Sequence, residues 1–378
     1  MNHPSVILCN EERYYLRHKK LHSPLYSSVQ SIPNARNLSS STITDTTRPF
    51  PDYSPKKPSV RDTELVHQIA NVIKLRRAEP LRRSLKPYEC KFKTDHLVWV
   101  LMKIRSDYSL VLDFFEWARS RRDSTIEGLC IVTHLAVACK DLRVAHSMIR
   151  SFWERPKLSV ADSFVQFFEL LVYTYKDWGS DPNVFDVFFQ VLVEFGMVRE
   201  VRKVFEKMLN YGLVLSVDSC NLYLDRLSKE CDKKTATAVV VFREFPKVGV
   251  CWNVASYNIV IHCVCQLGRI REAHHLLVLM ELKGYTPDVV SYSTVINGYC
   301  RFGELEKVWK LIEVMKKKGL KPNSYTHGSI ILLLCRSGKL VEAEEAFPEM
   351  VEHGIVPIET VPIVHYIISK SKCSEYLE

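Results

Sequence analysis

Twelve cysteines are the residues best suited to carry chemistry in this 378-residue chain, because thiols form disulfides and bind zinc. Their spacing favours neither use. No CxxC pair occurs, and Cys263 and Cys265 would point to different faces of a helix, so they could not both ligate one metal. Cys265, Cys300 and Cys335 recur at intervals of 35 residues, each late in an apolar stretch. This pattern is typical of small buried side chains in a reducing compartment.

Other catalytic patterns are also missing from the sequence. No GxGxxG, P-loop, HExxH or GxSxG motif occurs, and no spacing of paired carboxylates recurs. His274 and His275 are adjacent, so on a helix they diverge by about 100° and are expected to be surface and core side chains rather than a metal pair. The sequence therefore predicts a protein that is not an enzyme and that uses no cofactor, metal or small-molecule substrate.

Composition and charge set further bounds. The chain is 47% apolar, which is ample for a buried core. Its longest uncharged apolar runs fall short of the roughly 20 residues that a membrane-spanning helix needs, so no membrane partner is expected. The net charge is +9, but residues 182–358 carry 22 basic and 20 acidic side chains, so the basic surplus lies in the first half. An anionic partner is favoured without being required.

The secondary-structure elements that would position a functional site are expected to follow an internal repeat of 35 residues. Residues 254–288, 289–323 and 324–358 align without a gap. One glycine recurs in the middle of each unit (Gly268, Gly303, Gly338), and a second glycine and a proline recur near its end (Gly284, Gly319, Gly354; Pro287, Pro322, Pro357). Each unit is thus divided into two segments of similar length.

Within each segment the apolar residues follow the spacing of an amphipathic helix. The first stripe is Tyr257, Val260, Ile261 and Val264, copied as Tyr292, Val295, Ile296 and Tyr299. The second is Ala273, Leu276, Leu277 and Met280, copied as Val308, Leu311, Ile312 and Met315, then as Ala343, Ala346, Phe347 and Met350. Each unit is therefore predicted to be a helical hairpin whose second glycine is a left-handed C-cap. The predicted fold is an all-α superhelical solenoid of stacked antiparallel helix-turn-helix repeats of 35 residues.

The repeat continues upstream with less regularity. Units 182–216 and 217–253 carry the same stripes, and the second unit has two extra residues. The second stripe of that unit is Ala238, Val241, Phe242 and Phe245. Residues 91–181 are expected to be degenerate helical repeats, with one extra helix at 161–176. Residues 359–378 begin like another unit but match none, which predicts an incomplete C-terminal unit and an array that is apparently truncated.

The N-terminal segment has the composition of a targeting peptide. Residues 1–38 are basic, serine-rich and poor in acidic residues, and they lack the apolar core of a secretory signal. Arg36 stands three residues before a possible cut after Leu38. We expect a mitochondrial transit peptide, with a plastid as the alternative destination. Residues 39–90 are expected to form an N-terminal linker and extension, extended over 42–60 where four prolines lie.

A 35-residue hairpin that begins with Tyr-Asn and ends Met-x-x-x-Gly-x-x-Pro-Asp resembles the pentatricopeptide repeat, and units of plain 35-residue form resemble the P class of plant organellar members. The resemblance covers residues 182–358 and is strongest from 254. Tetratricopeptide repeats have a period of 34 and a different first helix. The resemblance implies binding of single-stranded organellar RNA, one base per repeat, alongside other RNA-processing proteins.

The same resemblance implies which residues read the bases: a polar residue in the first helix and the last residue of the unit. The pairs are Asn221 with Asn253, Asn258 with Asp288, and Ser293 with Asn323, for which the family's code implies a pyrimidine, uracil and adenine. Thr with Asp would imply guanine. Gly328 with Ile358 and Asp186 with Ser216 depart from the code. The extra residues in unit 217–253 could displace Asn221 and Asn253.

Two further features bear on this site. Val290 and Tyr325, one turn before the reading positions, are expected to wedge the bases, with Ala255 and Asp218 as weaker choices. Asn, Ser and Asp at helix starts are also ordinary capping residues that need no RNA. If the chain binds RNA, it is expected to serve RNA processing, stability, splicing or translation only by occupying a segment of the RNA, without catalysis. The alternative is a protein-interaction solenoid that holds a peptide, which the near-neutral charge of 182–358 leaves open.

Overall fold

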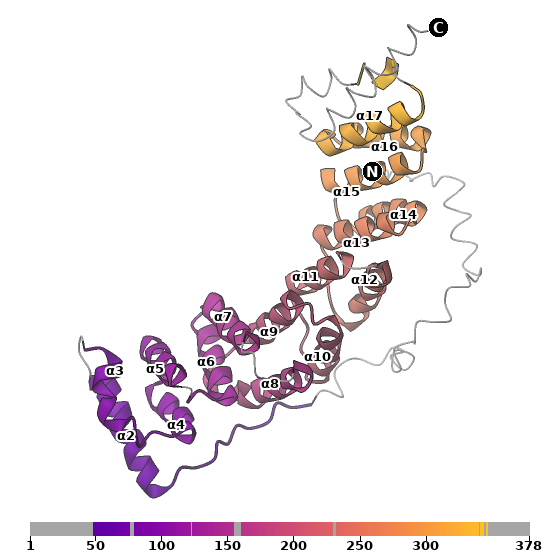
Figure 1. The fold of residues 1–378 in the computed structure, drawn as a ribbon. Helices are drawn as coiled ribbons and strands as arrows, with labels where there is room; N and C mark the ends of the chain where they lie inside the picture. Colours follow the sequence, from indigo (N-terminus) through magenta and orange to yellow (C-terminus); the bar gives the residue numbers. More distant parts are fainter. Residues whose placement is uncertain are drawn as a thin grey trace, which may run out of the picture. The chain divides into compact units, whose positions relative to one another are not determined.

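The computed structural model describes residues 48–75, 79–121, 123–154, 160–229, 232–339, 341–343 and 345–346, all within one compact unit that begins at Thr47. These residues form α-helices and short 3-10 turns without a strand (Figure 1). The expected transit segment 1–38 and the expected incomplete unit 359–378 lie outside the described residues. Within the described ranges, no helix is long and apolar enough to cross a membrane.

Each clear unit begins with a pair of antiparallel helices, as the glycine spacing predicts. The pairs are α9 (Asn183–Glu194) with α10 (Val198–Asn210), α11 (Val217–Ser228) with α12 (Asp232–Glu244), α13 (Val254–Gln266) with α14 (Ile270–Leu282), and α15 (Val289–Arg301) with α16 (Leu305–Lys317). The next first helix is α17 (Ser324–Arg336). The predicted stripes of α13, α14, α15 and α16 are buried throughout, so the helical period of the sequence is confirmed.

Glycines close both turns of a unit. Gly268 and Gly303 lie between the two helices at φ +73° and +75°, and Gly284 and Gly319 follow the second helix at +85° and +74°. At the end of α14 the backbone N–H of Tyr285 donates to the carbonyl of Met280 over 3.0 Å, which closes the last turn around Gly284. The predicted left-handed caps are therefore confirmed where the chain is described.

Unit 217–253 takes up its two extra residues in its second half. There α12 ends at Glu244 and continues as a 3-10 turn, η6 (Phe245–Val248), before the left-handed Gly249. The stripe predicted for this helix was wrong at one position, because Val239 is buried and Val241 is only half-buried. Phe245 is buried as predicted, but in the 3-10 turn, where Pro246 ends the regular helix.

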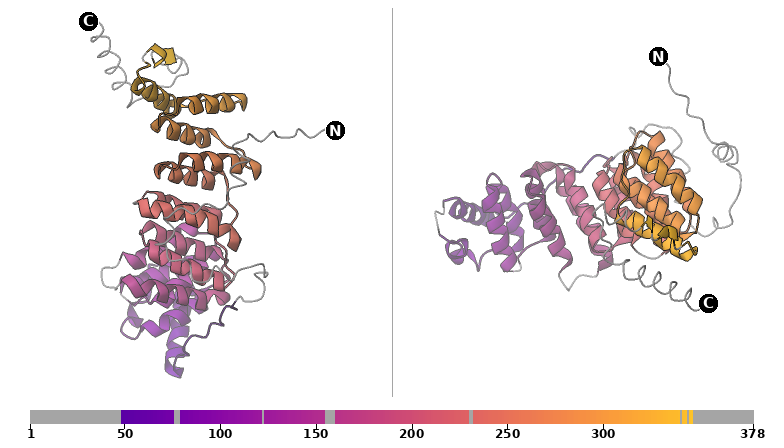
Figure 2. Two further views of the ribbon diagram at one scale, coloured as in Figure 1. Left: turned by 90° about the vertical axis from the view of Figure 1, so that its right-hand side faces the viewer. Right: turned by 90° about the horizontal axis from the view of Figure 1, so that it is seen from above.

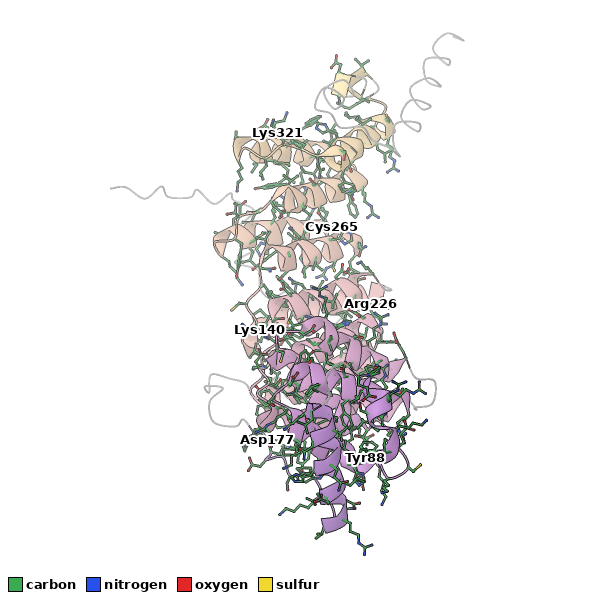
Figure 3. All side chains as sticks on the ribbon, turned by 90° about the vertical axis from the view of Figure 1, so that its left-hand side faces the viewer. Tyr88, Lys140, Asp177, Arg226, Cys265 and Lys321 are labelled. Atoms are coloured by element: carbon green, nitrogen blue, oxygen red, sulfur yellow. The ribbon has the colours of Figure 1, made fainter. Side chains whose placement is uncertain are left out.

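The helices lie in two rows. The first helices α9, α11, α13, α15 and α17 contact one another in succession, and the second helices α12 and α14 contact the first helix of the following unit (Figures 1 and 2). Side chains fill the space between neighbouring helices along the stack (Figure 3). The buried apolar residues, from Tyr53 to Ala343, form one continuous cluster. This arrangement confirms the predicted solenoid.

The N-terminal half holds α2 (Val60–Leu75), α3 (Leu81–Ser84), η4 (Lys86–Tyr88), α4 (Thr94–Ile104), α5 (Tyr108–Ser120), α6 (Ile126–Ala138), α7 (Leu142–Trp153), α8 (Val160–Thr174) and η5 (Tyr175–Trp178). The single helix expected at 161–176 is α8, continued by η5. Helix α2 lies in the stretch assigned to a linker and extension, and it packs on α4. Helix α6 is buried on all sides between Gly128 and Val137 and contacts α7, α8 and α9.

Residues 48–56 form an extended segment, here called the N-terminal strap, which lies against the helices. Its first contact is with α10, where the backbone N–H of Arg48 donates to the carbonyl of Asn210 over 2.7 Å. The ring of Phe50 then lies 4.5 Å from that of Tyr175 and 5.3 Å from that of Tyr211, between ring centroids. The stretch 42–60 is extended over its described residues, as expected, but it is not a free linker.

The strap continues across the preceding helices. The hydroxyl of Tyr53 donates to Glu127 of α6 over 2.9 Å, and the backbone of Ser54 exchanges two hydrogen bonds with the hydroxyl of Tyr173 on α8. The indole of Trp99 on α4 donates to the carbonyl of Lys56 over 2.9 Å. One segment of chain therefore links α4, α6, α8 and α10.

An aromatic cluster joins α7, α8 and α9. Phe188 is fully buried, with its ring stacked on Phe167 at 5.4 Å and lying 5.9 Å from both Trp153 and Phe168, between centroids. The three helices thus share one apolar centre at the point where the degenerate repeats meet the regular array.

His134 of α6 ties that helix to α8 and makes stability depend on pH. Its Nε2 lies 3.0 Å from the carbonyl of Leu171 and 3.0 Å from the hydroxyl of Thr174. Burial lowers the pKa of His134 to about 4. Because the unfolded chain binds this proton below about pH 6.5, the folded state loses stability as the pH falls from about 6.5 to 4, by on the order of 3 kcal/mol.

We expect the free energy of unfolding in urea to fall between pH 6.5 and pH 4 in the wild type, and to fall less over the same range in the variant His134→Gln. Gln retains an amide N–H for the Leu171 carbonyl but does not titrate. An unchanged slope of stability against pH in the variant would show that other groups cause it.

Candidate functional site

Four pairs of polar side chains, here called the polar pairs, recur along the first-helix row. They are Asp186–Ser216, Asn221–Asn253, Asn258–Asp288 and Ser293–Asn323. Nδ2 of Asn258 lies 3.2 Å from each carboxylate oxygen of Asp288, and Nδ2 of Asn221 lies 3.2 Å from Oδ1 of Asn253. The hydroxyl of Ser293 lies 3.4 Å from Oδ1 of Asn323. The structure therefore brings together each pair that the sequence predicted.

The second member of each predicted pair is also a helix cap. Asn253, Asp288 and Asn323 precede α13, α15 and α17, and each accepts a hydrogen bond from the backbone N–H three residues on. The capping interpretation is thus correct for these three residues. Asn258, in contrast, lies one turn inside α13, and its amide contacts Asp288, the cap of the next first helix α15. Capping alone does not account for the pairs.

The irregular unit keeps its pair in place. Its extra residues lie in η6, before Gly249, and the spacing from Gly249 to Asn253 equals that from Gly284 to Asp288. Asn253 therefore meets Asn221 as Asp288 meets Asn258. The displacement that the extra residues could have caused is absent.

The two pairs that depart from the predicted pattern differ from the rest. In the first, the hydroxyl of Ser216 donates to Oδ1 of Asp186 over 2.8 Å, so the cap is the donor and the helix residue the acceptor. In the last, Gly328 is buried and offers no side chain, and Ile358 lies outside the described residues. Exposure separates the others: Asn221, Asn258, Asn253, Asp288 and Asn323 are half-buried, whereas Ser293 is only 2% exposed.

Apolar side chains flank the pairs. Val290 and Tyr325, the second residues of α15 and α17, are 53% and 55% exposed. The side-chain amide of Asn297 donates to the hydroxyl of Tyr325, which holds the ring on the α15 side. Ala255 and Asp218 occupy the same place in α13 and α11 and are also exposed. Val290 and Tyr325 are thus exposed at the same position of successive first helices.

A series of cations at the other end of the same helices was not predicted from the sequence. Arg226, Arg301 and Arg336 lie in the last turns of α11, α15 and α17, and all three are exposed. Each complements the helix dipole there. Their recurrence in the last turn of three of the five first helices, with α9 and α13 as the exceptions, was the available signal. The near-neutral charge of the array as a whole hid it.

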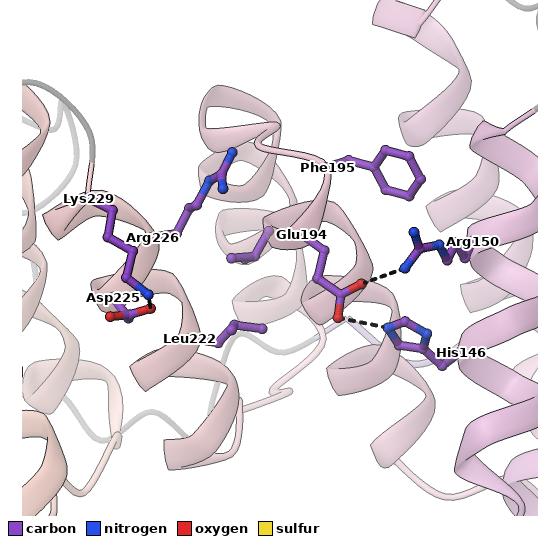
Figure 4. A pocket seen from close by; sticks show the side chains of 9 residues that line it. His146, Arg150, Glu194, Phe195, Leu222, Asp225, Arg226 and Lys229 are labelled. Atoms are coloured by element: carbon purple, nitrogen blue, oxygen red, sulfur yellow. Dashed lines mark hydrogen bonds and ion pairs between the residues drawn. The ribbon is translucent and has the colours of Figure 1, made fainter.

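A cavity of about 570 Å³ lies near that end, between α7, α9 and α11 (Figure 4). Its lining is charged, but the charges are largely paired. Glu194 accepts from Nε2 of His146 at 3.0 Å and lies 3.7 Å from Arg150, and Lys229 pairs with Asp225. The guanidinium of Arg150 also lies over the ring of Phe195. This arrangement joins α7 to the first helix of the regular array.

The chemistry of the thiols agrees with the sequence interpretation. Burial raises the pKa of Cys265 and of Cys300 to about 12, so both remain protonated at neutral pH. Cys335, expected to be equally buried, is only half-buried. Among the described residues, no group of three or more His, Cys, Asp or Glu side chains is placed to hold a metal ion.

The PPR repeat family model matches residues 252–301 and 287–332, and PPR repeat models match 318–351 and 184–213. The chain is 84% identical, over 255 residues, to a mitochondrial pentatricopeptide repeat-containing protein of Arabidopsis thaliana. The match covers 68% of this chain and 34% of that protein. A second mitochondrial protein of that family from the same plant is 32% identical over 34% of this chain and 24% of its own length.

The chain thus spans about a third or less of these curated relatives. Among solved structures, the pentatricopeptide repeat protein PPR10 from maize is similar with a TM-score of 0.46 and 19% identity, over 81% of this chain and 46% of that one. The PPR domain of Arabidopsis thaliana protein-only RNase P 1, solved in complex with tRNA, is similar with a TM-score of 0.44 and 15% identity, over 50% of this chain and 98% of that one.

Proposed function

Because this chain belongs to the pentatricopeptide repeat family, we propose that its polar pairs bind single-stranded RNA, one base per repeat. The observation that carries the proposal is the recurrence of a hydrogen-bonded polar pair in four successive units, beside an exposed side chain at the start of the next helix. Amide, hydroxyl and carboxylate groups so placed retain donors and acceptors for the edge of a splayed base.

The geometry supports some pairs more than others. Asn258 and Asp288 are half-buried and both keep unused hydrogen-bonding capacity, so we assign them the uracil that the family's code implies. Asn221 and Asn253 have the same arrangement and are assigned a pyrimidine. Ser293 is almost fully buried, so in its unit Asn323 is the main contact to the adenine, with Val290 and Tyr325 against the two faces of the base.

The role we propose is occupancy of an RNA segment in a mitochondrion. The mitochondrial name of the relative at 84% identity supports that location, and the basic, acid-poor segment 1–38 is consistent with import. Bound RNA would be shielded, kept unfolded or positioned for processing, splicing or translation, without a chemical step by this chain. Arg226, Arg301 and Arg336 supply exposed cations for the phosphates.

Binding to RNA homopolymers at increasing salt tests the proposal. We expect the wild type to bind single-stranded RNA with an affinity that falls as salt rises, and to bind less tightly when Arg301 and Arg336 are both replaced by Gln. A control pair, Lys310→Gln with Lys316→Gln, changes the same charge on the second helix α16. Absence of RNA binding, with retention of a peptide ligand, would favour the protein-interaction scaffold.

Replacing Asn258 by Thr is expected to change which base that unit prefers, from uracil to guanine. The family's code gives Thr with Asp for guanine, and the Thr hydroxyl is shorter than the Asn amide, so it reaches a different group of the base. We expect total affinity for the matched RNA to change little, and the ratio of uracil to guanine affinity to reverse. The measurement is binding to RNAs that differ only at that base, and an equal loss on all four bases would mean that Asn258 only supports the fold.

A further inference from the structure

In three of the four polar pairs, a buried hydroxyl from the third residue of the following first helix contacts the reading residue. Ser291, the third residue of α15, is fully buried, and its Oγ lies 2.6 Å from Oδ1 of Asn258. Ser256 stands in the same relation to Asn221, also at 2.6 Å, and the hydroxyl of Thr326 lies 2.7 Å from that of Ser293. The proposed reading residue of one repeat is therefore held by a side chain of the next.

These contacts close a ring of hydrogen bonds around Asn258. The backbone N–H of Asp288 donates to Oγ of Ser291 over 3.2 Å, which leaves the single proton of that hydroxyl for another acceptor. The backbone N–H of Ser291 in turn donates to Oδ1 of Asp288 over 2.8 Å. The nearest acceptor for the Ser291 hydroxyl is Oδ1 of Asn258, and Nδ2 of Asn258 faces the Asp288 carboxylate.

Only one orientation of the Asn258 amide satisfies this ring. A carboxylate accepts and does not donate, so Asp288 favours the amide nitrogen on its side, and the donating hydroxyl of Ser291 favours the amide oxygen on the other side. If the amide turned by 180°, its oxygen would face the carboxylate oxygens, and its nitrogen would replace the acceptor of the Ser291 hydroxyl. The hydrogen bond to the carboxylate would be lost in a half-buried site, where unmade hydrogen bonds are costly, and the Ser291 hydroxyl would have to turn to its second acceptor, Oδ1 of Asp288 at 3.0 Å.

We propose that the third-residue hydroxyls, and Ser291 above all, are positioning residues that set base specificity by fixing which end of the reading amide faces the base. This inference rests on the proposed RNA-binding function and adds to it a residue that does not itself touch the base. With the amide fixed, Asn258 presents its second N–H and Asp288 presents a carboxylate oxygen.

The consequence concerns uracil and cytosine, which differ at position 4. Uracil has a carbonyl oxygen there and accepts a hydrogen bond, whereas cytosine has an amino group and donates one. A fixed N–H favours uracil. An amide free to turn presents either its N–H or its oxygen, so it accommodates both bases and discriminates little between them.

The test uses three variants. Ser291→Ala removes the hydroxyl, Ser291→Thr restores it, and Thr294→Ala is a control on the same helix. Thr294 has a hydroxyl that donates to the carbonyl of Val290 and does not contact the pair. We expect Ser291→Ala to lower the preference for uracil over cytosine at that base about tenfold, as the loss of one hydrogen bond of about 1.4 kcal/mol predicts. Ser291→Thr and Thr294→Ala should keep the wild-type preference.

A second measurement needs no RNA. In protein labelled with nitrogen-15 at asparagine, the side-chain amide of Asn258, assigned by its loss in Asn258→Thr, should rotate slowly and exchange slowly in the wild type and in Ser291→Thr. In Ser291→Ala both rates should rise.

Wild-type discrimination that persists in Ser291→Ala, or equal amide rates in the two proteins, would overturn the proposal. If the wild type bound no RNA, the proposed function would fail and the amide rates would still decide whether Ser291 orients Asn258. A parallel loss of stability in Ser291→Ala and Ser291→Thr, with discrimination unchanged in both, would show a structural role only.

Discussion

Replacing Phe188 by Ala is expected to lower the free energy of unfolding by about 3–5 kcal/mol, the usual cost of removing a buried phenyl ring. The ring of Phe188 contacts aromatic side chains from both α7 and α8, so no single helix can move inwards to fill the space. Urea unfolding followed by circular dichroism measures the change.

Phe302 provides the matched control because it is the same residue type with 53% of its surface exposed. We expect Phe302→Ala to lower the free energy of unfolding by less than about 1 kcal/mol, since little apolar surface returns to water. Similar losses in the two variants would mean that the aromatic cluster does not hold the N-terminal half against the array.

Replacing Gly298 by Val is expected to lower the free energy of unfolding by about 3 kcal/mol, through overpacking between units. A Cβ at Gly298 would lie 2.3 Å from Cδ1 of Ile270 and 3.2 Å from Sγ of Cys265. Ile270 begins α14 and Cys265 lies in the last turn of α13, so the two γ-carbons of Val would push α15 away from the preceding hairpin. The measurement is again urea unfolding.

Two further variants distinguish overpacking at Gly298 from a general effect of substitution in α15. In Gly298→Ala the single methyl group displaces only the end of the Ile270 side chain, and the higher helix propensity of Ala offsets this by about 1 kcal/mol, so we expect little change. Thr294→Val keeps a β-branched side chain of the same size on the same helix and only replaces a hydroxyl by a methyl group, so it should cost less than about 1 kcal/mol. A stable Gly298→Val protein would mean that the units can separate without loss.

The regular array could be predicted from the sequence because its information is local and repeated. The stripe beginning at Tyr257 recurs at Tyr292, and glycines fix the turns at constant intervals, so helices, turns and stacking order all follow from one period. The resemblance to the pentatricopeptide repeat implied the polar pairs, and the period assigned them to residues such as Asn258 and Asp288, which occupy fixed places in a unit. Their pairing across the junction between two units follows once those units stack.

Other features depend on contacts between residues far apart in the sequence. Prolines in the stretch 42–60 predicted extended chain, but they hold no information about what Phe50 and Tyr53 lie against. Gly298 stands where the neighbouring units have Cys263 and Leu333, so its close approach to Ile270 breaks the pattern of the repeat. In the sequence, Ser291 is indistinguishable from an ordinary residue at the start of a helix. Only its contact with Asn258 of the preceding unit shows that it can also orient the amide of that residue.

The N-terminal strap changes how this chain can fold. In a stack of hairpins, each unit needs only its neighbours, so folding can spread from any starting point and the contact order is low. The strap breaks that rule, because its hydrogen bonds join Ser54 to Tyr173 across 119 residues and Arg48 to Asn210. During synthesis Phe50 and Tyr53 leave the ribosome long before η5 and α10 exist to receive them. The N-terminal half therefore completes as one cooperative block only after residue 210 has emerged, whereas the units from 254 onward can open and close singly.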